Sequence, residues 1–278
     1  MATLLAAFQR QQPGFQFVDV GANMGLYSAI CAVLFDPGRV VAFEPTPDVA
    51  EVARRVLAAN QVSTEIGWVE QCALGEHPGT VPLYLSAVSD SSNSLVAGFK
   101  QSVGSIDVTV TTLDDYVEAT GTVPAIVKID TETFEPAVIN GARATLQRFR
   151  PWLVVEVLHR RGHDHGIELS AAMDGLGYTY YRLAQTSDWR PRTAIAGEQG
   201  SKESDWLLTP EPIADGFGVD VRRWLDRLAR CTADRNPRLP VMTVARYVLR
   251  RHGVRGFTRR GLWYVKEHLP GRRAAEQG

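Results

Sequence analysis

The alternation of short apolar runs with longer helical patterns between residues 15 and 210 constrains the fold of this chain most. The apolar runs are rich in Val, Ile and Phe, and helical patterns follow many of them. This order is typical of the α/β class, in which helices cover both faces of a sheet. We expect strands at residues 15–20, 39–43, 66–72, 81–85, 106–111, 125–129, 152–157, 178–183 and 205–208, and helices at 25–34, 47–60, 113–118, 136–149 and 169–176.

Length, composition and cysteine content restrict the class of protein further. With 278 residues and 45% hydrophobic content, the chain can bury the core of one large domain, or of a domain with an appendage. No apolar run approaches the roughly 20 residues that span a bilayer, and the start of the chain lacks the basic leader of a signal peptide. The three cysteines, Cys31, Cys72 and Cys231, lie far apart and form no C-x-x-C pair. We therefore expect a reduced, cytoplasmic protein without a cysteine zinc site or a disulfide framework.

The net charge of -1 hides a strong asymmetry along the chain. Residues 220–278 carry 15 Lys and Arg against 5 Asp and Glu, which leaves 15 basic and 26 acidic residues before them. After Pro210 the pattern changes to basic amphipathic helices, so we expect an α/β domain over 1–212 and a helical C-terminal extension over 213–278. The extension would pack on the acidic domain or in a homodimer, or bind a membrane surface or a biosynthetic enzyme. Nucleic-acid binding is not expected, because the acidic part would repel phosphate.

The first strand ends in the run F-V-D-V-G-A-N-M-G, which contains Asp19, Gly21, Asn23 and Gly25. Glycine at a strand-to-helix turn lets the backbone approach a ligand, and the next helix presents its positive N-terminus there. A dinucleotide site would instead require G-x-G-x-x-G to hold a pyrophosphate. The spacing D-x-G-x-x-x-G suits S-adenosylmethionine (SAM), which has no phosphate. A tight turn without a ligand is the alternative.

The next two strands end in residues that suit a nucleoside. Glu44 ends the second strand, where a carboxylate can accept both ribose hydroxyls. The alternative role for Glu44 is an acid near the start of the following helix. The third strand ends at Cys72 and Ala73, where backbone and side chains would meet an adenine ring.

Several runs together, in order and spacing, resemble one family. They are DVGANMGLYS, AFEP, WVEQCALG, SSNSL, TLDDY, KIDTETFEPAVINGA and RPWLVVEV. Over about residues 15–160 the chain resembles the FkbM-type SAM-dependent methyltransferases. The resemblance implies a seven-stranded, Rossmann-like class I methyltransferase sheet. It also implies O-methylation of a hydroxyl on a sugar, a glycan or a polyketide-type natural product.

Two departures from the family pattern concern the site. After the strand at 125–129, the family commonly reads D-x-E-G, where this chain has Asp130-Thr131-Glu132-Thr133. A β-branched threonine adopts a positive φ only at a cost, so a different turn geometry is expected. The segment before the first strand is also short, so part of the usual lid would be missing or supplied elsewhere.

Acidic residues at strand ends are the candidate catalytic groups. By the switch-point rule, Asp130 and Glu132 lie at the carboxyl edge of the sheet, beside the cofactor. An alcohol is a weak nucleophile, so a positioned base would accelerate its methylation by about 10²–10⁴-fold. The other candidates for this base are Glu156, near the end of the strand at 152–157, and His159, just after it. Glu135, next to Pro136, is expected to begin a helix in a structural role.

Two further clusters have both a functional and a structural interpretation. The run H-R-R-G-H-D-H offers His159, His163, Asp164 and His165 as metal ligands, but loops also collect histidines for solubility. Ser92, Asn93 and Ser94 would line a sugar pocket, although turns prefer the same residue types. The alternatives to a methyltransferase are a nucleotide-dependent oxidoreductase, which the glycine spacing disfavours, and a binding or scaffold module with a vestigial site.

Overall fold

The computed structural model describes residues 1–35, 37–87, 93–98, 101–160, 163–183, 189–196 and 204–230. For residues 159, 160, 163 and 227–230 it describes the backbone only. The chain divides into two compact units, Met1–Trp224 and Leu225–Gly278. This division falls inside a helix, later along the chain than the expected boundary near residue 212.

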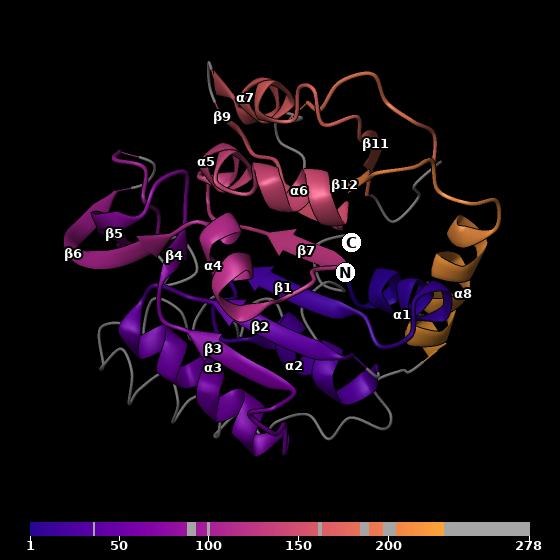
Figure 1. The fold of residues 1–278 in the computed structure, drawn as a ribbon, viewed down its shortest axis with the longest axis horizontal. Helices are drawn as coiled ribbons and strands as arrows, with labels where there is room; N and C mark the ends of the chain where they lie inside the picture. Colours follow the sequence, from indigo (N-terminus) through magenta and orange to yellow (C-terminus); the bar gives the residue numbers. More distant parts are fainter. Residues whose placement is uncertain are drawn as a thin grey trace, which may run out of the picture. The chain divides into compact units, whose positions relative to one another are not determined.

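A seven-stranded sheet forms the centre of the first unit (Figure 1). Its strands lie in the order β11-β12-β8-β7-β1-β2-β3, and all are parallel except β12, which runs antiparallel to both neighbours. Their bounds are β1 Gln16–Val20, β2 Arg39–Phe43, β3 Gly67–Glu70, β7 Ile126–Ile129, β8 Trp152–Glu156, β11 Thr179–Arg182 and β12 Asp205–Thr209. The expected Rossmann-like methyltransferase sheet is therefore confirmed. Because the chain winds outward from β1 in both directions, the carboxyl ends of β1 and β7 form a topological switch point.

Helices cover both faces of the sheet (Figure 1). The helices are α1 Ala2–Gln11, α2 Leu26–Leu34, α3 Pro47–Ala59, α4 Leu113–Thr120, α5 Glu135–Asn140, α6 Arg143–Phe149, α7 His165–Ala172 and α8 Phe217–Arg230. On one face α4 to α7 bury large aliphatic side chains, such as Leu146 and Leu169, against Val18 and Val127 of the sheet. On the other face α2 and α3 pack through alanines against β2, which brings both helices close to the sheet. Each face therefore has its own apolar core.

Two of the expected strands do not belong to the main sheet. Residues 81–85 and 106–111 lie in the long hairpin strands β5 Gly79–Ser86 and β6 Ser102–Thr111. Together with the short strand β4 Ala73–Leu74 they form a separate three-stranded sheet, at the left of Figure 1. A second small pair consists of β9 His159–Arg160 and β10 His163–Asp164. The nine expected strands therefore divide between the seven-stranded sheet that the resemblance implied and the three-stranded hairpin sheet.

Two helices also differ from expectation. Helix α1 was not predicted, although Leu4, Leu5 and Phe8 on it are buried. The expected single helix over 136–149 is divided into α5 and α6 at Gly141 and Ala142. Among the helices that the structure describes, none combines the length and the apolar character needed to cross a bilayer.

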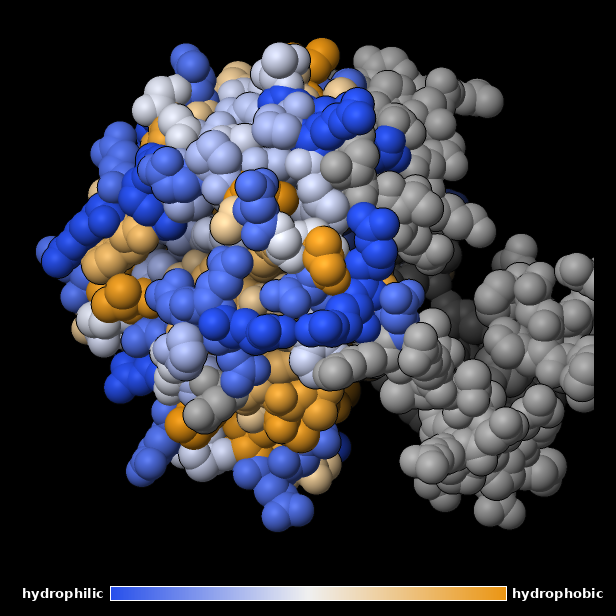
Figure 2. Space-filling model, turned by 90° about the vertical axis from the view of Figure 1, so that its right-hand side faces the viewer, coloured by the Kyte–Doolittle hydropathy of each residue, from blue (hydrophilic) through white to orange (hydrophobic). Residues whose placement is uncertain are grey.

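Helix α2 exposes large apolar side chains on its outer surface. Leu26 and Leu34 are more than half exposed, and Val33 and the preceding Met24 are half exposed. Figure 2 shows an apolar patch in its lower half, the half in which α2 lies in Figure 1.

Candidate functional site

A pocket opens at the carboxyl edge of the sheet, beside the switch point between β1 and β7. The loops after β1, β2 and β7, the strand β4 and the hairpin β5–β6 supply its lining. Polar groups come from Gly21, Asn23, Glu44, Thr46, Asn93, Ser94, Asp130, Thr131 and Glu132. Apolar groups come from Val20, Phe43, Pro45, Ala73, Leu74, Leu83, Leu95 and Phe134. The pocket therefore combines an apolar wall with convergent polar groups, as small-molecule sites do.

The turn after β1 approaches the turn after β7 at Gly21. This glycine has φ +75°, and a Cβ atom there would collide with the carbonyl oxygen of Asp130. Only glycine satisfies both the left-handed conformation and the close approach. Asn23, two residues later, also has a positive φ of 52° and lines the pocket. Gly25 starts α2 but does not line the pocket, so its predicted contact with a cofactor stays a prediction.

Glu44 connects the second strand to this first turn. Its Oε2 accepts a hydrogen bond from the backbone N–H of Asn23 at 2.9 Å, and its Oε1 accepts one from Thr46 at 2.9 Å. The carboxylate is only 6% exposed, and burial raises its pKa, whereas the backbone N–H donors lower it. Because each carboxylate oxygen has a second lone pair, Glu44 can still accept hydrogen bonds from a ligand in the pocket. This matches the place and chemistry predicted for a ribose acceptor.

The third strand contributes less than predicted. Ala73 lines the pocket, but Cys72 does not. Burial raises the pKa of the Cys72 thiol to about 11, helped by the negative charge of Glu70. A raised pKa disfavours the thiolate, which is the nucleophilic form of a cysteine. The role of Cys72 as a cofactor contact stays a prediction.

The turn after β7 brings Asp130, Thr131 and Glu132 to the pocket. Glu132 has φ +54° and Thr133 has φ +84°, so the expectation that Thr133 would avoid a positive φ was wrong. Glu135 holds this unusual turn from below: its Oε1 accepts hydrogen bonds from the N–H and hydroxyl of Thr131 at 2.8 and 3.0 Å, and from the N–H of Thr133 at 3.3 Å. Glu135 begins α5, as predicted, and it is buried.

Lys128 is the site residue that sequence reasoning missed. Its side chain extends from β7 and is 7% exposed. The ammonium nitrogen Nζ lies 2.8 Å from Oδ2 of Asp130 and 3.9 Å from Oδ1 of Asp19. Asp19 is fully buried, accepts a hydrogen bond from the hydroxyl of Ser28 at 2.7 Å, and does not line the pocket. Its direct contact with a cofactor stays a prediction, and the observed contacts join it to α2 and β7. A lysine inside the buried strand I-V-K-I was the available signal, because an isolated buried charge requires a partner.

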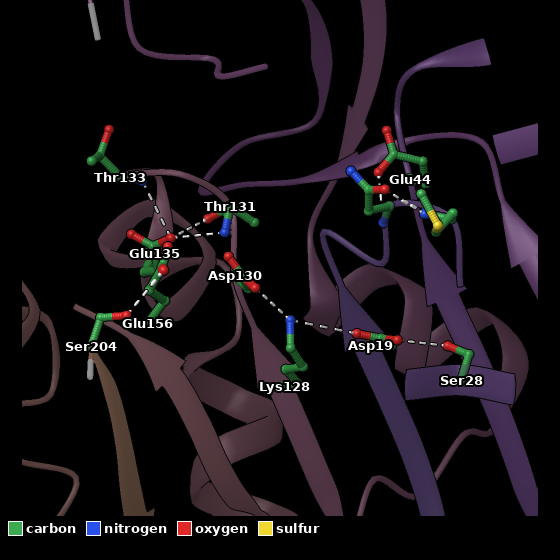
Figure 3. A network of polar contacts seen from close by, with 12 residues as sticks. Asp19, Ser28, Glu44, Lys128, Asp130, Thr131, Thr133, Glu135, Glu156 and Ser204 are labelled. Carbon is green, nitrogen blue, oxygen red and sulfur yellow. Dashed lines mark hydrogen bonds and ion pairs between the residues drawn. The ribbon is translucent and has the colours of Figure 1, made fainter. Parts of the chain in front are cut away.

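Glu156 and His159 are the groups predicted on the substrate side, and the structure describes the side chain of Glu156 only. Glu156 ends β8, accepts a hydrogen bond from the Ser204 hydroxyl at 3.1 Å, and does not line the pocket (Figure 3). Burial and the negative charges of Asp130, Glu132 and Glu135 raise its pKa to about 8. The backbone of His159 lies in β9, but its side chain lies outside the described residues. Within the described part of the chain, no group of three His, Cys, Asp or Glu side chains is placed to hold a metal.

Asn93 and Ser94 line the pocket, but their side chains are bound within its wall. The Asn93 carbonyl accepts from the N–H of Ser86 at 2.9 Å, and its amide donates to Thr46 Oγ1 at 3.4 Å. The hydroxyl of Ser94 donates to the carbonyl oxygen of Glu132 at 2.8 Å, so it holds the hairpin to the acidic turn. Ser92 lies outside the described residues. Substrate contact by these residues stays a prediction.

The chain matches the family model described as the methyltransferase FkbM domain over residues 19–180. It is 38% identical over 66 residues to the curated "Methyltransferase sdnD" of Sordaria araneosa, which covers 24% of this chain and 25% of that protein. The match therefore spans about a quarter of the length of this relative.

Two solved structures are similar at low sequence identity. The methyltransferase FkbM of Methylobacillus flagellatus KT is 17% identical with a TM-score of 0.45, over 75% of this chain and 47% of that one. The O-methyltransferase of Bacillus cereus, solved in complex with SAH (S-adenosylhomocysteine), is 15% identical with a TM-score of 0.44, over 74% and 78%. This chain thus spans about half of the solved FkbM chain.

Proposed function

Because the chain belongs to the FkbM methyltransferase family, we propose that it uses SAM to methylate a hydroxyl group of a sugar, a glycan or a polyketide-type natural product. One observation carries the proposal. The close approach of Gly21 to Asp130 joins the turn suited to the cofactor and the acidic turn in a single pocket. A methyl donor and an acceptor hydroxyl bound there would be held close together, and such positioning lowers the barrier of a displacement reaction.

The residues around the pocket fit SAM in three ways. The Glu44 carboxylate is held by two backbone N–H groups and keeps acceptor capacity for the two ribose hydroxyls. The turn of Gly21 and Asn23 supplies the backbone groups that would meet the methionine part. Phe43, Leu74 and Phe134 give an apolar wall for the adenine ring.

The acidic turn gives the reaction its electrostatics and its base. When bound, SAM supplies a methyl group activated by a positive sulfonium. Asp130 and Glu132 line the same pocket, so their negative charges favour a cation there and their oxygens can orient an acceptor hydroxyl and take its proton. Glu156 does not line the pocket, which leaves Asp130 and Glu132 as the better-placed bases.

The cellular context belongs to the same proposal. We place the protein in the cytoplasm and assign the basic C-terminal extension, residues 213–278, to packing on the acidic domain or in a homodimer, or to contact with a membrane surface or a biosynthetic enzyme. The residues beyond 230 lie outside the described structure. The excess of basic residues in 220–278, with 15 Lys and Arg against 5 Asp and Glu, supports this assignment.

Transfer of labelled methyl groups tests the activity. The full chain is incubated with methyl-labelled SAM and a panel of glycosides and polyketides, and the products are analysed for O-methyl ethers by NMR. We expect a labelled ether from the wild type and a turnover lowered at least about 10²-fold in Glu132→Gln or Asp130→Asn, for whichever residue is the base. Binding of SAM without transfer to any member of the panel would favour the alternative, a binding or scaffold module.

A further inference from the structure

A row of four polar side chains crosses the floor of the site beneath the pocket. Figure 3 shows Ser28, Asp19, Lys128 and Asp130 side by side, linked in that order. Ser28 lies on α2, Asp19 on β1 and Lys128 on β7, and Asp130 directly follows β7. Of these four residues only Asp130 lines the pocket, and the other three are buried.

The two ion pairs of Lys128 are unequal. Its ammonium donates a hydrogen bond to Asp130 at 2.8 Å, which is the distance of a strong charge-assisted bond. The separation of 3.9 Å from Asp19 is too long for a hydrogen bond, and Oδ1 of Asp19 has no hydrogen-bond partner. The ammonium also lies 5.3 Å from the centre of the Tyr27 ring. The directional interaction of Lys128 is therefore with Asp130.

Asp130 requires such an anchor. Its backbone is fixed, because its N–H donates to the carbonyl of Val20 and its carbonyl is in contact with Gly21. Its side chain is 36% exposed and would otherwise be free to turn toward solvent. The hydrogen bond from Lys128 holds one carboxylate oxygen of this pocket-lining side chain.

We propose that Lys128 is a positioning residue, which fixes the Asp130 carboxylate at the wall of the pocket so that it faces the positive charge of the cofactor. This inference rests on the proposed function. A lysine that positions Asp130 and a lysine that only repels the cofactor have opposite effects on SAM binding when they are removed. The positive charge of Lys128 alone opposes a cationic ligand, so its removal would strengthen SAM binding if repulsion were its main effect. If Lys128 instead orients Asp130, its removal weakens SAM binding.

Calorimetric titration with SAM and SAH separates these effects, because SAH lacks the sulfonium charge. We measure the ratio of the two dissociation constants in the wild type, Lys128→Met, Asp130→Asn and the double variant. The preference for SAM over SAH is expected to fall about tenfold in each single variant and no further in the double variant. Lys128→Arg, which keeps the cation, should stay closer to the wild type than Lys128→Met.

Two outcomes would overturn the proposal while leaving the proposed function in place. One is a greater preference for SAM in Lys128→Met. The other is a double variant in which the two losses multiply, because Lys128 would then act independently of Asp130. The matched control is Arg55→Met, which removes a cation that pairs with Glu51 at 2.8 Å on the exposed surface of α3. It should leave the SAM to SAH ratio unchanged.

A second measurement needs no cofactor and so does not depend on the proposed function. Urea unfolding of Lys128→Met, Asp130→Asn and the double variant forms a double-mutant cycle. If the lysine holds Asp130, the loss of stability in the double variant is smaller than the sum of the two single losses. Additive losses would show that the two side chains are not coupled and would contradict the proposal.

Discussion

Glu156 makes the stability of the protein depend on pH. Its pKa rises from 4.5 to about 8 in the folded state, so between these pH values the folded protein keeps a proton that the unfolded chain has released. Stability is therefore fully present below pH 4.5 and is lost as the pH rises toward 8. Glu156→Gln imitates the protonated acid at every pH. We expect its free energy of unfolding to match that of the wild type near pH 5 and to be about 1–2 kcal/mol higher at pH 8. This value is reduced for solvent screening, because Glu156 is partly exposed.

Urea unfolding of both proteins at pH 5, 6, 7 and 8 measures this difference. Glu135, whose pKa is raised to about 7 by burial, titrates in the same range, and its charge acts on Glu156, so the difference between the curves reports the coupled pair. Parallel curves for the wild type and Glu156→Gln would show that Glu156 ionises freely in the folded state.

Thr133 stores strain in the acidic turn. It combines a φ of +84° with a buried hydroxyl that has no hydrogen-bond partner. A strained backbone and an unsatisfied hydroxyl each lower the free energy of unfolding by about 1–3 kcal/mol. Glycine makes the unfolded chain more flexible, which lowers the free energy of unfolding by about 0.4–1 kcal/mol. We expect Thr133→Gly to raise the free energy of unfolding by about 1 kcal/mol, measured by denaturant titration.

The matched control for Thr133→Gly is the same substitution at Thr145. This residue lies in α6, is 2% exposed and also has a buried hydroxyl without a partner, but it has no positive φ. Thr145→Gly should destabilise the protein, because glycine is unfavourable inside a helix. If both substitutions destabilise to a similar extent, Thr133 is not strained.

At the residue scale, the pocket-lining positions Gly21, Asn23, Glu44, Asp130 and Glu132 could be predicted because each lies directly after a strand. Strand ends can be read from local apolar patterns, and parallel strands bring their carboxyl ends to one edge. Lys128 and the contacts of Ser94 could not be predicted in this way. Their roles depend on distances between segments far apart in the chain, such as the 2.8 Å bond from Ser94 to Glu132.

Helix α1 shows how an element adds to the core. Phe8 is 2% exposed, and its ring makes edge contacts with Phe15 at 5.3 Å and with Trp152 at 5.1 Å between ring centres. Phe8→Ala should therefore lower the free energy of unfolding by about 3–5 kcal/mol. Chemical denaturation measures this loss.

Arg10→Ala on the same helix is the control for Phe8→Ala. Arg10 pairs with Asp220 at 3.2 Å, but it is 56% exposed, so its loss should cost about 1 kcal/mol or less. A similar loss in both variants would mean that α1 contributes through general helix content and not through the packing of Phe8.

At the element scale, the existence of the strands was predictable and the environment of the helices was not. The periodicity over 136–149 continues without a break, but Gly141 approaches the backbone of Gly75 so closely that a Cβ would collide with it. The carboxylate of Asp114, from another helix, then accepts hydrogen bonds from the N–H groups of Ala144 and Thr145 at the start of α6. This cap comes from a distant segment, so local sequence shows no N-cap residue for α6.

At the scale of the whole molecule, the order of the strands creates the site. Because β2 and β3 lie on one side of β1 and β7 and β8 on the other, the loops after β1 and β7 diverge and leave a pocket between them. The family resemblance implied this topology, but it did not specify that the hairpin β5–β6 would form one wall of the pocket. Short alternating strands do not specify which sheet they join, so this wall could not be predicted.

The proposed function requires that this pocket hold SAM, with Glu44 at its ribose. Calorimetric titration of the full chain with SAM and with NAD⁺, in the wild type and in Glu44→Gln, tests this requirement. We predict one SAM per chain, no heat with NAD⁺, and a loss of about 2–3 kcal/mol in SAM affinity for Glu44→Gln. Glu51→Gln, on the exposed surface of α3, should bind SAM like the wild type. Unchanged SAM affinity in Glu44→Gln, or binding of NAD⁺ in place of SAM, would contradict the account.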